Sequence, residues 1–213
     1  MQTLDSISAT PEGALSSPAA QRNAAAILAI LRAHLPARGR VLEIAAGSGE
    51  HALRFATDLP DLEWTPTDPS PAARDSILAW RREGPANLRS ALALDAADPA
   101  TWPEDRYDAV YCANMTHISP WSATEGLMAL AGRVLRRPGG LLVLYGPYRE
   151  TDVPLATSNA AFDASLRARD PAWGLRERER VEDLARSHGL APTLRIEMPA
   201  NNLMLLFLSL IHI

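Results

Sequence analysis

Short apolar segments with the length of β-strands alternate with helical patterns along most of this 213-residue chain. Such alternation is typical of a parallel sheet with helices on both faces, because each crossover between parallel strands needs a helix. Seven segments have strand character: residues 40–44, 62–67, 87–94, 107–113, 141–145, 193–198 and 202–210. Only Pro199-Ala200-Asn201 separates the last two, so the last strand should run antiparallel. We therefore predict an α/β, Rossmann-like fold with a seven-stranded, mostly parallel sheet and one antiparallel strand.

The first helical pattern runs from Pro18 to Leu35, and Pro36 ends it. Residues 1–18 contain serine, alanine and proline and have no strong periodicity. We therefore expect residues 1–18 to be a flexible N-terminal arm and residues 19–213 to form a single domain.

Composition excludes several classes of function. All 21 basic residues are arginines, and the missing lysine rules out Schiff-base enzymes, phosphate-binding loops and kinases of the usual kind. The formal net charge of −4 disfavours nucleic acid and membrane surfaces as partners. A single cysteine, Cys112, cannot form an internal disulfide, and no signal peptide is visible, so a cytoplasmic location is expected. No spacing of His, Cys and Asp suggests a metal site.

Candidate binding residues follow the strands, because ligands of doubly wound sheets bind at the carboxyl ends of the strands. Glu43 lies inside the first strand, where it contacts the ligand, orders the following turn by accepting its N–H groups, or does both. The small residues of that turn, Gly47-Ser48-Gly49, let a ligand approach the backbone. Asp68 follows the second strand, where a carboxylate either accepts hydrogen bonds from two ribose hydroxyls or serves as a turn or cap residue ahead of Pro69. Asp95 follows the third strand, and it either accepts from an adenine amino group or caps the short helix near Pro99.

This arrangement resembles the class I S-adenosylmethionine-dependent methyltransferases over residues 23–210. Where that family carries E/D-x-G-x-G-x-G, this chain has Glu43-x-Ala45-x-Gly47-x-Gly49. The acidic residues Asp68 and Asp95 and the turn Pro138-Gly139-Gly140 complete the match. Ala45 replaces the first glycine, and its methyl group tightens the approach of the cofactor without excluding it, since alanine can adopt negative φ. The resemblance implies the methyltransferase fold and S-adenosylmethionine as cofactor.

A narrower resemblance points to the methyltransferase-like protein 26 family, an uncharacterised methyltransferase-like group. The runs that carry it are Arg22-Asn23, Leu42-Glu43-Ile44-Ala45, His117-Ile118-Ser119-Pro120-Trp121, Tyr145-Gly146-Pro147-Tyr148, Ser158-Asn159-Ala160-Ala161-Phe162-Asp163 and Pro199-Ala200-Asn201-Asn202. This resemblance supports the fold and the cofactor, and it implies no substrate.

Further candidates lie after the later strands and before the first helix. Asn114 and His117 face the expected place of a methyl acceptor, where His117 serves either as a base or in packing and cofactor contact. Tyr148 and Asn202 belong to the same rim, and the asparagine either orients a polar acceptor or serves the hairpin turn. The run Arg22-Asn23 either folds over the cofactor carboxylate or simply begins the helix. The catalytic candidates are His117, Tyr148 and Asn202, and the cofactor-binding candidates are Arg22, Asn23, Glu43, Ala45, Gly47, Ser48, Gly49, Asp68, Asp95 and Asn114.

The sequence therefore predicts an enzyme that transfers the methyl group of S-adenosylmethionine to an unidentified small molecule. A sulfonium is already a strong electrophile, so the protein mainly has to align nucleophile, methyl carbon and sulfur. One alternative is a non-catalytic cofactor-binding or protein-interaction module with the same fold. A second alternative is a nicotinamide-dependent oxidoreductase. The closing hairpin argues against its short-chain members, and so does the lack of lysine, because their catalytic Tyr-x-x-x-Lys motif cannot occur in this chain. The oligomeric state does not follow from the sequence.

Overall fold

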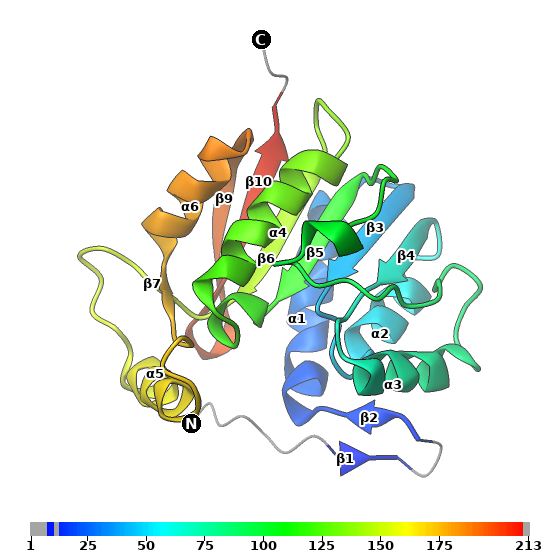
Figure 1. Ribbon diagram of the computed structural model, residues 1–213, viewed down its shortest axis with the longest axis horizontal. Helices are drawn as coiled ribbons and strands as arrows, with labels where there is room; N and C mark the ends of the chain where they lie inside the picture. The colour runs from blue at the N-terminus through cyan, green and yellow to red at the C-terminus, as the bar shows by residue number, and fades with distance from the viewer. Residues whose placement is uncertain (1–7, 11–12, 211–213) are drawn as a thin grey trace.

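A computed structural model describes residues 8–10 and 13–210. Its main sheet has the strand order β4-β3-β5-β6-β10-β9 (Figure 1). The strands are β3 (Gly39–Ile44), β4 (Leu62–Pro66), β5 (Ala109–Ala113), β6 (Leu141–Gly146), β9 (Leu190–Met198) and β10 (Asn202–Ser209). The first four run parallel, and β10 is antiparallel to both β6 and β9. The mixed α/β architecture and the closing antiparallel strand are confirmed.

The prediction of seven strands is wrong, because the main sheet contains six. The segment over residues 87–94 runs beside β4 but makes only isolated bridges, at Trp64 with Leu88 and at Thr67 with Leu92. The N–H of Trp64 donates to the Asn87 carbonyl (2.9 Å), and the N–H of Leu92 donates to the Pro66 carbonyl (3.1 Å). Pro66 faces this segment but has no N–H to donate, so the ladder is interrupted where a central bond should form.

Helices cover both faces of the sheet (Figure 1). One core lies between the sheet and α1 (Pro18–His34) with α2 (Glu50–Asp58), and the other lies under α4 (Trp121–Val134) and α6 (Arg178–Ser187). Neighbouring residues of β3 enter opposite cores, Val41 the first and Leu42 the second, as the alternation of a strand requires. The remaining elements are α3 (Pro71–Arg81), α5 (Thr157–Arg169), the 3₁₀ turns η1 (Pro99–Thr101), η2 (Met115–His117) and η3 (Pro199–Asn201), and the short parallel pair β7 (Tyr148–Arg149) and β8 (Arg176–Glu177).

Part of the expected flexible arm has regular structure and packs on the domain. β1 (Ser8–Ala9) and β2 (Leu15–Ser16) pair antiparallel, and Ala14 is buried. Ser17 then caps α1, which begins at Pro18 as predicted. Residues 1–7 and 11–12 of the arm lie outside the described residues. That residues 19–213 form a single domain stays a prediction.

Candidate functional site

The turn between β3 and α2 has an open glycine and a tightly packed glycine. Gly47 and Gly49 have φ values of 57° and 86°, in the left-handed region that favours glycine. A Cβ on Gly47 would have no other heavy atom within 4 Å, whereas a Cβ on Gly49 would lie 2.8 Å from Ile77. Gly47 therefore leaves space beside the backbone for a ligand, and Gly49 lets α2 pack against α3. Ser48 between them is buried.

Ala45 also has a left-handed backbone, with φ of 55°, so the expectation of a negative φ is wrong. This conformation costs a non-glycine residue about 1–2 kcal/mol. The substitution Ala45→Gly removes this strain from the folded state, but it also increases the conformational entropy of the unfolded chain, which offsets part of the gain. The free energy of unfolding is therefore expected to rise by about 0.5–1 kcal/mol. Urea denaturation checks this result. The control Ala160→Gly, on the exposed side of α5, should lower stability instead, and a loss in both variants would contradict the argument.

Asp68 joins the glycine turn to the end of β4. Its Oδ2 accepts the N–H of Gly47 (3.0 Å), and its Oδ1 accepts the N–H of Ser70 (2.9 Å). The residue is buried, with 7% of its surface exposed. Each carboxylate oxygen can accept a second hydrogen bond. Asp68 therefore serves the turn, as the structural interpretation expected, and it also keeps acceptor capacity for two hydroxyls.

Glu43 is buried one strand away from Asp68. Burial raises its pKa to about 8, and the charge of Asp68 adds to the shift, while a hydrogen bond from Trp64 Nε1–H to Oε2 (2.6 Å) opposes it. Among the described residues, the Glu43 side chain makes no hydrogen bond to the glycine turn, so it does not order the turn in that way. Its carboxyl pairs with Trp64, and the turn N–H of Gly47 goes to Asp68.

Asn23 connects α1 to the same end of the sheet. Its Oδ1 lies 2.7 Å from His51 Nε2, which also lies 3.2 Å from the Ala20 carbonyl. Both partners are acceptors, so Nε2 carries the proton. Burial lowers the pKa of His51 to about 4, and the ring is neutral at pH 7. Arg22 beside it is exposed, and a role for Arg22-Asn23 over a cofactor stays a prediction.

His117 is fully buried, behind the rim formed by the strand ends. Its ring packs edge-on against Tyr148, with 4.9 Å between centroids, and its Nε2 lies 3.2 Å from Thr116 Oγ1. A Cβ on Gly146 would lie 2.3 Å from Nε2, so the glycine is needed for this packing. Burial and the charge of Arg176 lower the pKa of His117 to about 3. Of the two roles expected for His117, this environment favours packing.

Tyr148 and Asn202 are buried as well. Tyr148 lies at the start of β7, its hydroxyl is 3.5 Å from Thr116 Oγ1, and burial raises its pKa. The Asn202 Nδ2 group donates to the Pro199 carbonyl (3.0 Å), which is the turn role foreseen for it. Their catalytic roles stay predictions.

Asparagines gather where β5, β6 and β10 meet. Asn114 has φ of 61° and donates its N–H to the Tyr145 carbonyl (2.8 Å). Leu203 pairs with Gly146, so the η3 turn lies beside the end of β6. There the Asn159 Nδ2 group donates to the Asn201 carbonyl (2.9 Å), while its buried Oδ1 has no hydrogen-bond partner among the described residues. Asn159 belongs to one of the runs that carry the narrower resemblance, but only the tertiary structure shows its contact with the η3 turn.

Asp95 is exposed and lies in the loop before η1. Its Oδ1 accepts the N–H of Ala97 (2.8 Å). The expectation that it caps the short helix is wrong, because Asp98 caps η1 by accepting the N–H of Ala100 (3.0 Å). The second carboxylate oxygen of Asp95 remains available to a ligand, and its adenine role stays a prediction.

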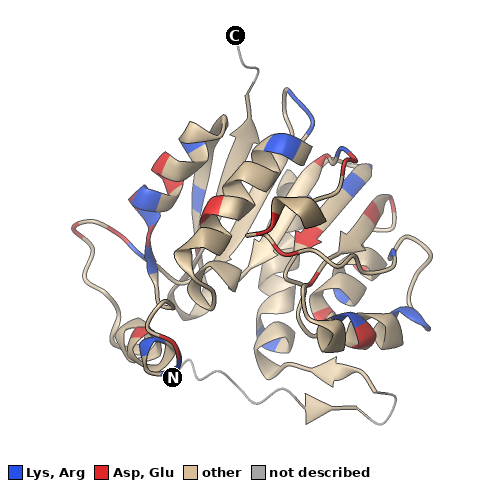
Figure 2. Ribbon diagram, in the orientation of Figure 1, with Lys and Arg blue, Asp and Glu red and all other residues tan. Residues whose placement is uncertain are grey.

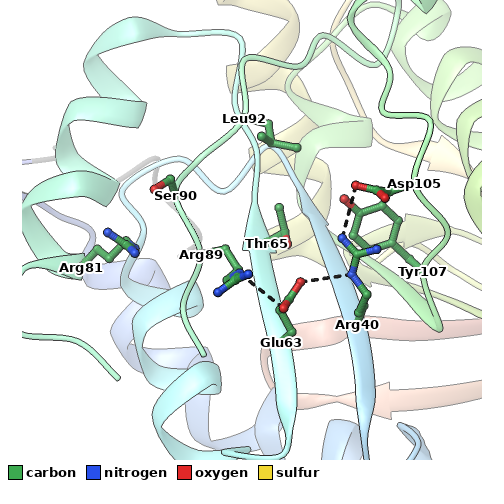
Figure 3. A pocket seen from close by; sticks show the side chains of 9 residues that line it. All are labelled: Arg40, Glu63, Thr65, Arg81, Arg89, Ser90, Leu92, Asp105 and Tyr107. Carbon is green, nitrogen blue, oxygen red and sulfur yellow. Dashed lines mark hydrogen bonds and ion pairs between the residues drawn. The ribbon is translucent and has the colours of Figure 1, made fainter. Parts of the chain in front are cut away.

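A pocket of about 320 Å³ lies elsewhere, beside the amino-terminal halves of β3 and β4 (Figure 3). Four of its charged groups form ion pairs: Glu63 with Arg40 (3.1 Å) and Arg89 (3.4 Å), and Asp105 with Arg40 (3.3 Å). None of the candidate site residues lines this pocket. Acidic and basic residues are interspersed over the ribbon (Figure 2).

The described residues, 8–10 and 13–210, contain neither a metal site nor a membrane-spanning helix. Within these ranges no cluster of three or more His, Cys, Asp and Glu residues could hold a metal ion. None of the helices there is long and apolar enough to cross a membrane.

The model of a family described as "Protein of unknown function (DUF938)" matches residues 14–209. The chain is also similar to three solved structures. The mitomycin 7-O-methyltransferase MmcR matches 91% of the chain at 16% identity and a TM-score of 0.76. An O-methyltransferase family 2 protein from Planctomyces limnophilus, in complex with apigenin, matches 90% of the chain at 19% identity and a TM-score of 0.74. The calicheamicin methyltransferase CalO1, with S-adenosylhomocysteine bound, matches 86% of the chain at 17% identity and a TM-score of 0.67. The chain spans only 53% to 57% of these three proteins, and the likeness shows a shared α/β methyltransferase fold.

Proposed function

We propose that this chain, which belongs to the DUF938 family, is an S-adenosylmethionine-dependent methyltransferase that acts on a small molecule. One observation carries the proposal. Glu43, the open Gly47 and the acceptor oxygens of Asp68 meet at the carboxyl ends of the adjacent strands β3 and β4, in a chain with a methyltransferase fold.

The residues present fit the cofactor. The space beside Gly47 admits a ligand, and Asp68 can still accept from two ribose hydroxyls. Asp95 would accept from the adenine amino group, while Glu43, Asn114 and the run Arg22-Asn23 would face the methionine end. Bound there, S-adenosylmethionine supplies an electrophilic methyl group. The protein then aligns the acceptor and excludes water, which needs no metal or nucleophilic side chain.

The narrower link to the methyltransferase-like protein 26 family is part of the proposal. Residues from different resembling runs contact one another at one edge of the sheet. Asn159 donates to Asn201, and the His117 ring packs on Tyr148 and Gly146. Runs that are remote in sequence but share one site support a common function for them.

A small acceptor also fits the nature of the rim. Apigenin, bound to one structural relative, is a small molecule. In this chain Asn159, which donates to Asn201, lies three residues before Phe162 on α5, and Phe162 belongs to an apolar cluster with Leu166 and Leu175. The proposed acceptor is therefore a small, partly apolar compound with polar groups, and neither nucleic acid nor a membrane surface is a proposed partner.

Calorimetric titration with S-adenosylmethionine and S-adenosylhomocysteine tests the cofactor. Absence of binding at millimolar concentration would overturn the proposed function. Binding without methyl transfer to a broad panel of small hydroxyl, amine and thiol compounds would favour the non-catalytic module.

His117 offers a second test. Because its pKa is held near 3, the imidazole is already neutral at pH 5, and the methyl-transfer rate is expected to show no His117 limb between pH 5 and pH 8. The measurement is the pH–rate profile of the wild type beside that of His117→Gln. A limb near pH 6.5 that disappears in the variant would identify His117 as a base.

A further inference from the structure

We propose that residues 14–17, here named the strap, complete the cofactor site, and that Glu50 is the positioning residue connecting the strap to the glycine turn. The inference rests on the proposed function and concerns the same site. It assigns a binding role to a segment that the sequence indicates only as an arm.

Glu50, the first residue of α2, makes the first connection. Its Oε2 accepts the N–H of Ser17 (2.5 Å) and the hydroxyl of Ser48 (3.1 Å). Its Oε1 accepts from Gln21 Nε2 (2.8 Å) and from the hydroxyl of Ser16 (3.4 Å). One carboxylate thus joins the strap and the start of α1 to the central residue of the turn. Its negative charge is also favourable at a helix N-terminus.

Helix α3 makes the second connection, through Ser76 and Trp80. The buried Ser76 hydroxyl accepts the N–H of Leu15 (2.7 Å) and donates to the Ser48 carbonyl (2.6 Å). The Trp80 indole N–H donates to the Leu15 carbonyl (3.1 Å). Both backbone groups of Leu15 are therefore held by α3, and Ser48 is held through its hydroxyl and its carbonyl.

These contacts leave the glycine turn little freedom. Asp68 holds Gly47, while Glu50 and Ser76 hold Ser48. The strap is hydrogen-bonded to both Glu50 and Ser76. Glycine-rich turns lose much conformational entropy when they are ordered. A turn that is already fixed spares this cost when a ligand binds, so the strap should increase cofactor affinity without touching the cofactor.

Glu50→Gln in the full chain tests the inference, with Glu83→Gln, an exposed glutamate after α3, as the matched control. Glutamine replaces one carboxylate oxygen by an N–H₂ group, which cannot accept the hydrogen bonds that this oxygen of Glu50 now accepts, and it removes the charge. The expected result is a loss of S-adenosylhomocysteine affinity of about tenfold or more by calorimetry. Hydrogen exchange should become faster in peptides covering residues 14–17 and 44–50, while circular dichroism stays that of the control.

Ser76→Ala provides a second variant, should Glu50→Gln fail to fold. It should weaken binding in the same way, and the double variant should show non-additive losses because both side chains hold Ser48. If both single variants keep the wild-type affinity for S-adenosylhomocysteine and the wild-type hydrogen-exchange rates, the role of the strap is overturned while the proposed function stands. A wild type that binds no S-adenosylhomocysteine would overturn the proposed function, and the role of the strap in binding with it.

Discussion

Replacing Glu43 with glutamine is expected to remove a fall in stability that the wild-type carboxyl causes between about pH 5 and pH 8. The pKa of Glu43 is about 8 in the folded protein, against 4.5 for the exposed group, chiefly because the carboxyl is buried. At intermediate pH the folded state holds a proton that the unfolded state releases. The contribution of Glu43 to the free energy of unfolding is therefore greatest below pH 4.5 and is lost as the pH rises through 8. The full change is on the order of 4 to 5 kcal/mol.

Urea denaturation from pH 5 to pH 8.5 checks this expectation. Glutamine keeps an oxygen for the Trp64 indole N–H and cannot ionise, so the stability of Glu43→Gln relative to wild type should rise with pH. His51 and His117 act in the opposite direction. Their lowered pKa values make stability fall as the pH drops below 6.5, which is why the difference between variant and wild type must be measured. A constant difference across this range, like that of Glu83→Gln, would contradict the burial of a protonated Glu43.

Asp68→Ala is expected to weaken S-adenosylmethionine binding by about 1–3 kcal/mol and to lower stability by a similar amount. The variant leaves the N–H groups of Gly47 and Ser70 without their carboxylate acceptor, which loosens the glycine turn. It also removes the oxygens proposed to accept from the ribose. Calorimetry and thermal unfolding measure the two effects separately.

Asp75→Ala, an exposed carboxylate on α3, is the matched control and should change neither quantity. Asp68→Asn separates the two roles, because an amide still offers one oxygen to the turn but fewer acceptor sites to a ribose. Unchanged cofactor affinity in Asp68→Ala would remove Asp68 from the site.

Local patterns were sufficient for most of the fold. Short apolar segments identified β3, β5, β6 and the closing hairpin, and the helical pattern that begins at Pro18 identified α1. The segment over residues 87–94 misled the prediction because its own composition suits a strand. Its hydrogen-bond ladder is interrupted at Pro66, which belongs to the neighbouring strand β4. A pattern read along one segment holds no information about the strand that will lie beside it.

The candidate site divides in the same way. Glu43, the glycine turn and Asp68 were predictable, because parallel strands bring their carboxyl ends to one edge whatever the rest of the chain does. Their partners were not, since Trp64, Ser76 and Glu50 are ordinary residues until packing places them beside Glu43 and the glycine turn.

Sequence alone determined the α/β alternation, the strand-end carboxylates and, through the absent lysine, which side-chain chemistry this chain cannot supply. Only the tertiary structure decided that His117 is buried and neutral, that Ala45 adopts a left-handed backbone and that Glu50 joins Ser17 to Ser48 of the glycine turn. The physical reason is range. Periodicity and turn chemistry depend on neighbours along the chain, whereas burial, pKa and hydrogen-bond partners depend on residues that folding brings from far away in the sequence.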